Sequence, residues 1–158
     1  MNLKKFSCTL LSLLLVLSTT LLIGCNNAPA PQPPEDEEQA AIDYTLANIR
    51  NTIDAYIVIR SENASKMIKD AIIDLRTGIN EALGVKPDVS VDWNENKKSE
   101  YEIVIGETER PESAEAMSSL SDEKPYDIVQ IGTKICIVGR DDYAVRRAVY
   151  EFLSLHIG

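Results

Sequence analysis

The residues best suited to chemistry lie in the stretch YEIVIGETERPES, residues 101–113. Two acids, Glu107 and Glu109, follow an apolar run that ends at a glycine, and Thr108 and Arg110 stand beside them. Paired carboxylates are the catalytic groups of glycosidases, in which their separation sets the stereochemical outcome. Neither acid is flanked by the apolar residues that surround a catalytic proton donor. The spacing alone therefore gives weak support to catalysis.

The same stretch is explained more simply as a loop between a strand and a helix. The glycine lets the strand turn, Thr108 satisfies loop backbone, and Pro111 with Glu112 starts a helix whose positive end favours acids. This interpretation is favoured over catalysis, so no catalytic residue is expected. Glu107, Thr108 and Arg110 remain candidate contacts for a ligand.

Other polar residues give weaker signals. His156 is the single histidine and has no nucleophile or metal-ligand motif around it. Asp141 and Asp142 precede a helical pattern, which favours one helix cap and one solvated acid over a cation site. Trp93 could stack on a sugar ring, but it alternates in phase with the two preceding valines and is expected in the core. No cofactor and no metal site are expected.

The first residues predict export. Lys4 and Lys5 precede an apolar run from Leu10 to Ile23, the layout of a secretory signal. The run ends in LLIGC, residues 21–25, which resembles the lipobox of bacterial lipoproteins. This resemblance implies that residues 1–25 are a signal ending at a lipidated Cys25, and that the protein is anchored to a bacterial cell membrane and exposed outside the cytoplasm. An ordinary signal peptide with an incidental cysteine is the alternative.

Charge and cysteine content narrow the classes of partner. Residues 1–25 carry two lysines and no acid, so the remaining chain has a formal charge of −11. Such a surface repels nucleic acid and anionic lipid headgroups, and membrane attachment would depend on the lipid. Cys136 lies among apolar residues in KICIVG and is expected to be a small buried hydrophobe.

A linker precedes the predicted domain. Four prolines between residues 29 and 34 are followed by four acids, a composition that favours an extended, solvated tether. We assign residues 26–54 to this tether and its lead-in. Within it, residues 40–53 fit either a helix or a short strand.

Residues 55–158 predict an α+β domain with a mixed sheet. Apolar periodicity indicates a central strand at 55–60, and then a helix at 64–83 capped by Ser61 or Asn63. Two strands, a helix from Pro111 to about Leu120, a hairpin around Gly132 and Thr133, and a last helix follow. The expected order is β-α-β-β-α-β-β-α, and the remaining expected strands are 88–93, 101–105, 126–131 and 134–139.

Three of these segments together resemble a known family. Residues 101–113, 126–139 and 141–153 are similar to the small noncatalytic α/β domain that precedes the barrel of hexosaminidase and alpha-glucuronidase type glycoside hydrolases and related bacterial surface lipoproteins. The resemblance implies helices mainly on one face of the sheet and a role as an accessory to carbohydrate processing. It also implies a glycan, or a catalytic domain or partner packed on the last helix. The 158 residues contain no barrel, so none of the family's catalytic residues has a counterpart here. A standalone glycan- or protein-binding lipoprotein is the alternative function.

Overall fold

The computed structural model describes residues 42–94 and 97–158. The chain divides into two units, Met1–Gln39 and Ala40–Gly158, and all of the described residues belong to the second. The predicted signal, the lipidated Cys25 and the proline-rich part of the tether therefore lie outside the described residues.

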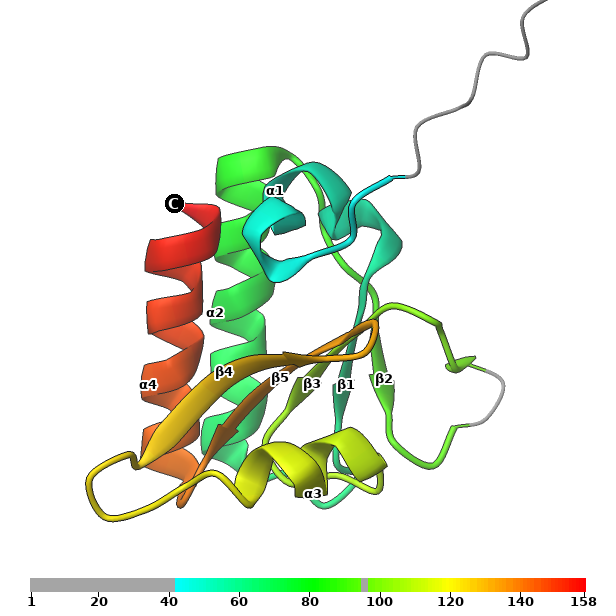
Figure 1. Ribbon diagram of the computed structural model, residues 1–158. Helices are drawn as coiled ribbons and strands as arrows, with labels where there is room; N and C mark the ends of the chain where they lie inside the picture. Colours follow the sequence, from blue (N-terminus) through cyan, green and yellow to red (C-terminus); the bar gives the residue numbers. More distant parts are fainter. Residues whose placement is uncertain (1–41, 95–96) are drawn as a thin grey trace, which may run out of the picture. The chain divides into compact units, whose positions relative to one another are not determined.

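The domain is built on one five-stranded mixed sheet, in the order β2-β1-β3-β5-β4. Neighbouring strands run parallel except for β4 and β5, which are antiparallel (Figure 1). The mixed α/β class predicted from the sequence is confirmed. The strands are β1 (Ile57–Arg60), β2 (Val89–Val91), β3 (Glu102–Ile105), β4 (Tyr126–Ile131) and β5 (Lys134–Gly139).

The hairpin between β4 and β5 forms where its sequence predicts. Ile131 pairs with Lys134, which leaves Gly132 and Thr133 as a two-residue loop. Gly132 has a φ of +59°, a conformation that glycine adopts at little cost.

Helices precede, connect and follow the strands. The main ones are α2 (Lys66–Leu83), α3 (Pro111–Met117) and α4 (Asp142–Phe152), and α4 continues into a π-helical turn, η4 (Leu153–Ile157). The lead-in forms helical turns rather than a strand: η1 (Leu46–Asn48), α1 (Ile49–Thr52) and η2 (Ile53–Ala55). Ile49 and Ile53 belong to the core of the domain.

Of the two predicted helix caps, that of α4 is confirmed and that of α2 is wrong. Asp141 caps α4, because its carboxylate accepts a hydrogen bond from the Ala144 N–H at 2.8 Å. The cap of α2 is Ser65, so the prediction of Ser61 or Asn63 is wrong. The helix begins later because the Ser61 hydroxyl accepts from the backbone N–H of Asn63 at 3.2 Å, within the turn that leaves β1.

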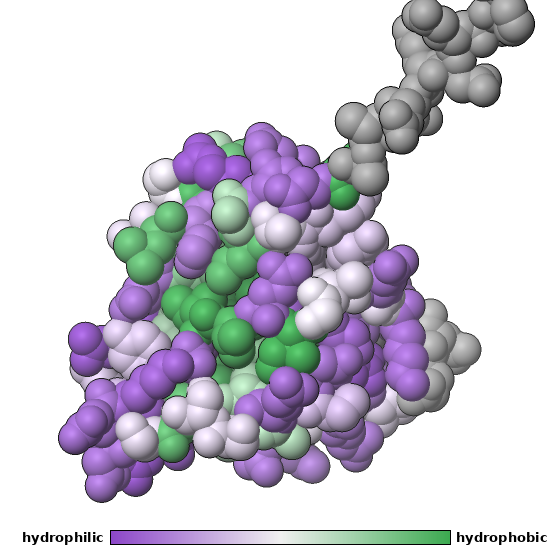
Figure 2. All heavy atoms as spheres, viewed as in Figure 1, coloured by the Kyte–Doolittle hydropathy of each residue, from purple (hydrophilic) through white to green (hydrophobic). Residues whose placement is uncertain are grey.

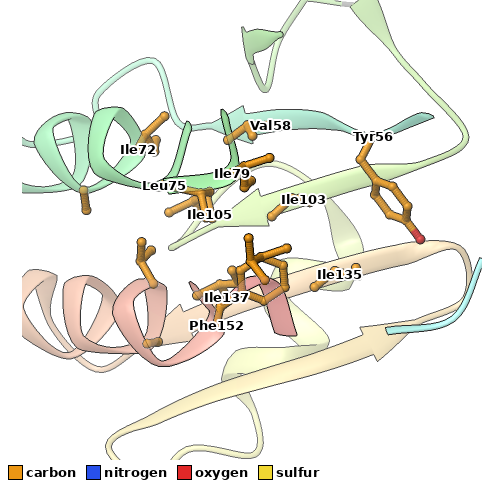
Figure 3. Close-up of a cluster of buried hydrophobic side chains, with 14 of the residues drawn as sticks. Tyr56, Val58, Ile72, Leu75, Ile79, Ile103, Ile105, Ile135, Ile137 and Phe152 are labelled. Atoms are coloured by element: carbon orange, nitrogen blue, oxygen red, sulfur yellow. The ribbon is translucent and has the colours of Figure 1, made fainter. Parts of the chain in front are cut away.

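Alternate residues of the strands face two separate apolar layers. On one face, strand residues pack with α2 and α4 in the larger cluster, part of which Figure 3 shows: Val58, Ile103, Ile105, Ile135 and Ile137. On the other face, Ile59, Val104, Cys136 and Val138 pack with Ala116 of α3. Cys136 is fully buried, as predicted, and burial raises the pKa of its thiol to about 12.

The last helix uses its apolar face within the domain. Val145, Ala148, Val149 and Phe152 are buried in the larger cluster with residues of α2 and the sheet. In the view of Figure 2, hydrophobic residues gather near the middle of the face and hydrophilic ones surround them. Within the part of the chain that the structure describes, no helix is long and apolar enough to cross a membrane.

Gly139 allows α4 to approach the end of β5. A Cβ at this position would meet the backbone N of Val145 at 2.5 Å and the backbone C of Ala144 at 2.8 Å. Backbone atoms cannot rotate away, so we expect Gly139→Ala to lower the free energy of unfolding by about 3 kcal/mol. Urea denaturation measures the loss. Glu81→Ala, on an exposed position of α2, should change it by no more than about 0.5 kcal/mol, and equal effects of the two variants would contradict the close approach.

Candidate functional site

A crevice of about 620 Å³ lies at the carboxyl ends of the parallel strands. Residues that follow β1, β2, β3 and β5 all contribute to its lining. The chain leaves β1 for α2 on one face of the sheet, whereas it leaves β3 for α3 on the other face. Ligands of open α/β sheets bind where connections diverge in this way. These strand ends lie at the lower edge of the sheet in Figure 1. The crevice formed there is therefore our candidate site.

Acidic side chains dominate the lining of the crevice. Among the described residues, Arg140 is the single basic one in the lining, and its guanidinium is bonded to Asp122 outside the crevice. The indole of Trp93 also lines it and is 53% exposed. The six acids of the lining are Glu62, Asp92, Glu107, Glu109, Asp141 and Asp142.

Asp92 joins the loops that form the crevice. Its carboxylate accepts hydrogen bonds from the backbone N–H groups of Glu62 at 3.2 Å, Trp93 at 3.1 Å and Glu109 at 3.1 Å. These donors belong to the loops after β1, β2 and β3. Asp92 is only 4% exposed, so its negative charge is compensated mainly by these contacts. One side chain thus fixes three loops.

The predicted core position of Trp93 is wrong. The alternation has the opposite phase to the expected one, because Ser90 is buried in β2 whereas Val89 and Val91 are only partly buried. Asp92 continues the buried phase and points inward to its three donors, and Trp93 falls in the phase of the valines and lies partly in water. This exposure is compatible with stacking on a sugar ring, the role that the sequence analysis placed second to a core position.

Beneath the loops lies a buried ion pair. The guanidinium of Arg110 donates to both carboxylate oxygens of Glu102, at 2.8 and 3.0 Å, and to the carbonyl oxygen of Asp92 at 2.7 Å. Arg110 is 5% exposed and Glu102 is fully buried. Lys134 adds a second positive charge 3.4 Å from Glu102 and 3.1 Å from Glu112.

Opposing effects set the pKa of Glu102. Burial, the largest of them, raises the pKa of this carboxyl group. Hydrogen bonds from Arg110 and from the Ser99 backbone, together with the charges of Arg110 and Lys134, outweigh burial and leave the pKa below its ordinary value of 4.5. Glu102 is therefore a carboxylate in the folded protein at neutral pH.

The three candidate ligand contacts divide between two environments. Glu107 and Thr108 line the crevice, whereas Arg110 lies in the buried ion pair. The loop interpretation of this stretch is confirmed: Thr108 Oγ1 accepts from the Arg110 N–H at 3.2 Å, and Pro111 opens α3. His156 lies outside the crevice, with its ring 5.5 Å from that of Phe152. Among residues 42–94 and 97–158, no group of three or more His, Cys, Asp or Glu could hold a metal ion.

Sequence reasoning missed Glu102 and Asp92 as organising residues. A charged residue at the start of the apolar run EIVI was the available signal for Glu102, because a charge in a central strand needs a partner. Asp92 had no such signal, since its place in an alternating pattern indicated a solvent-facing side chain.

Comparisons with known proteins identify no family for this chain. No protein-family model matches this chain, and no curated protein matches it.

Removal of one partner of the buried ion pair should cause a large loss of stability. We expect Arg110→Met to lower the free energy of unfolding by about 3–5 kcal/mol, because it leaves the Glu102 carboxylate buried without its main partner. The matched control is Arg140→Met, which breaks an exposed ion pair with Asp122 and should cost no more than about 1 kcal/mol. Denaturant titration of both variants measures the difference, and similar losses would contradict a special role for the buried pair.

The pair of Glu102 and Arg110 also predicts how the stability of the fold depends on pH. Because the folded-state pKa of Glu102 is lowered, its contribution to stability is present above the ordinary value of 4.5 and is lost as the pH falls through the folded-state pKa. We therefore expect the gap in stability between the wild type and Arg110→Met to narrow below pH 4.5. A gap that stays constant in acid would show that Glu102 is not the group involved.

Proposed function

We propose that this chain is a lipid-anchored bacterial surface lipoprotein whose folded domain is a noncatalytic accessory to carbohydrate processing. In this proposal the domain belongs to the hexosaminidase and alpha-glucuronidase type of glycoside hydrolase related proteins, and it binds glycan in the crevice. The order of its elements, from β1 to α4, would then be that of the family's noncatalytic domain. The resemblance in residues 101–113 and 141–153 supports the family assignment.

The exposed indole of Trp93 in the crevice is the observation that carries the proposal. A flat aromatic ring offers an apolar surface to the C–H face of a sugar, while nearby carboxylates, hydroxyls and amides can accept or donate hydrogen bonds to its hydroxyl groups. Ser61, Asn63 and Thr108 supply such groups in the same lining. The volume of about 620 Å³ lies within the range of small-ligand pockets, about 300–1,000 Å³.

The noncatalytic part rests on the surroundings of the acids. A general acid that cleaves a glycosidic bond needs an apolar environment that keeps its carboxyl group protonated. Glu62, Glu107, Glu109 and Asp142 are exposed to water, and Asp92 has its oxygens engaged by backbone donors. These environments suit recognition of a ligand better than proton transfer.

A standalone binding lipoprotein is the second candidate. It is favoured by the fact that four loops of the described domain, those after β1, β2, β3 and β5, all contribute to the lining of the crevice. The reading frame after the codon for Gly158 distinguishes the two. A frame that continues into a barrel favours the accessory role, and a stop codon favours the standalone one.

Glycan binding should depend on Trp93. We expect Trp93→Ala to weaken binding of the glycans that the full chain captures on an array by at least tenfold, which corresponds to about 1.4 kcal/mol. Tyr143→Ala removes another exposed aromatic side chain, 72% exposed and outside the crevice lining, and should leave affinity unchanged. Failure of the full chain to bind any glycan would refute the binding role, and enzyme-like hydrolysis of chromogenic glycosides would refute the noncatalytic one.

Membrane attachment should depend on Cys25. Cells that express Cys25→Ser should incorporate no labelled fatty acid into the protein, because the acceptor thiol is absent. Cys8→Ser is the control, since the predicted signal carrying that residue is removed before the mature protein is formed. Label in the Cys25→Ser protein, or loss of label in the control, would contradict the predicted lipid site.

A further inference from the structure

The crevice is rich in hydrogen-bond acceptors and poor in free donors. One N–H group at the start of each of two helices already donates to a side chain of the protein. Ser65 Oγ accepts from the Ile68 N–H at 3.2 Å in α2, and Asp141 accepts from the Ala144 N–H in α4. In phosphate-binding proteins, helix ends offer such groups to the ligand. Here one such group of each helix has a partner within the chain.

The loop donors are engaged in the same way. Asp92 accepts from the N–H groups of Glu62 and Glu109, and Ser113 Oγ accepts from the Thr108 N–H at 3.1 Å. A ligand in the crevice therefore meets carboxylate, hydroxyl and carbonyl oxygens more often than free N–H groups. An anionic ligand would find few donors and would be repelled by the six acids.

The charge of the crevice is neutralised only in part. None of the salt bridges found between described residues involves Glu62, Glu107 or Asp142, and the Arg60 guanidinium donates to the backbone carbonyl of Glu62. The guanidinium of Arg140 is engaged by Asp122, which weakens its effect on the crevice. A concave surface lined by one sign of charge focuses its field and concentrates ligands of the opposite sign.

Trp93 adds a preference for a ring that carries positive charge. Its backbone N–H is fixed by Asp92, and its indole is half exposed in the same lining as the acids. The face of an indole attracts both C–H groups and cations. A ligand that combines a saturated ring with an ammonium group satisfies the aromatic side chain and the carboxylates at the same time.

We infer that the crevice binds a sugar chain that bears free amino groups. The ring of one residue stacks on Trp93, and its ammonium group lies among Glu62, Glu107 and Asp142. This inference rests on the proposed glycan-binding function and specifies the class of glycan. A lysine-rich peptide would share the charge but lacks the rigid ring that makes the indole useful.

The test compares ligands that differ in one group. Isothermal titration of the full chain in detergent, in slightly acidic buffer, uses a β-1,4-linked glucosamine tetramer and the matching glucose tetramer, which has a hydroxyl in place of each amine. We expect the glucosamine tetramer to bind at least tenfold more tightly at low salt. The ratio should shrink at high salt, because mobile ions screen the carboxylates.

Substitutions then locate the preference. The triple variant Glu62→Gln, Glu107→Gln, Asp142→Asn should bring the affinity ratio of the two tetramers close to one, because it removes the three charges and lowers affinity for the glucosamine tetramer far more than affinity for the glucose tetramer. A control with the same loss of charge, Asp54→Asn, Glu81→Gln, Glu115→Gln, alters exposed acids outside the crevice and should keep most of the preference. Circular dichroism checks that both variants are folded.

Each outcome decides between the two proposals. Equal binding of the two tetramers would overturn the amino-sugar inference and leave the glycan-binding function standing. Binding of neither, together with no capture of any glycan on the array, would overturn both. Binding of tetralysine as tight as that of the glucosamine tetramer, and insensitive to Trp93→Ala, would identify a site for cationic peptides and overturn the sugar class.

Discussion

The buried pair of Glu102 and Arg110 is the constraint on which the rest of the site depends. A carboxylate in the central strand β3 is removed from water, so it is stable only while a guanidinium is held against it. Arg110 stands immediately before α3, and its third contact reaches the carbonyl oxygen of Asp92. The pair therefore couples the sheet to the loop after β3 and to the loop after β2.

This arrangement determines the shape of the crevice as well as the stability of the fold. An apolar pair of similar volume could pack in the same place, but it would lack the fixed, planar geometry of a bidentate guanidinium and carboxylate. Asp92 extends that geometry to the backbone of Glu62 and Glu109. Loops that are already ordered lose less entropy when a ligand binds, which favours recognition by a crevice with few deep contacts.

The features that were predicted correctly depend on near neighbours in the chain. The period of apolar residues in α2 and the two residues between β4 and β5 are local patterns, so the mixed α/β class and the hairpin could be inferred from them. The Trp93 position failed because a period of two does not say which phase faces the core, and in β2 the buried phase belongs to Ser90 and Asp92. That choice is set by tertiary packing, since β2 is an edge strand whose neighbour is β1.

The sequence by itself determined the mixed α/β class and the acidity of the chain, because each is a matter of composition or short-range pattern. The export signal is a prediction from the same kind of pattern. The sequence also determined that the stretch after β3 is a turn leading into a helix. Only the tertiary structure brought the four loops together at one edge of the sheet and paired Glu102 with Arg110. The physical reason is that a buried charge is tolerable only beside its partner, and the partner's position is fixed by contacts between segments far apart in the chain.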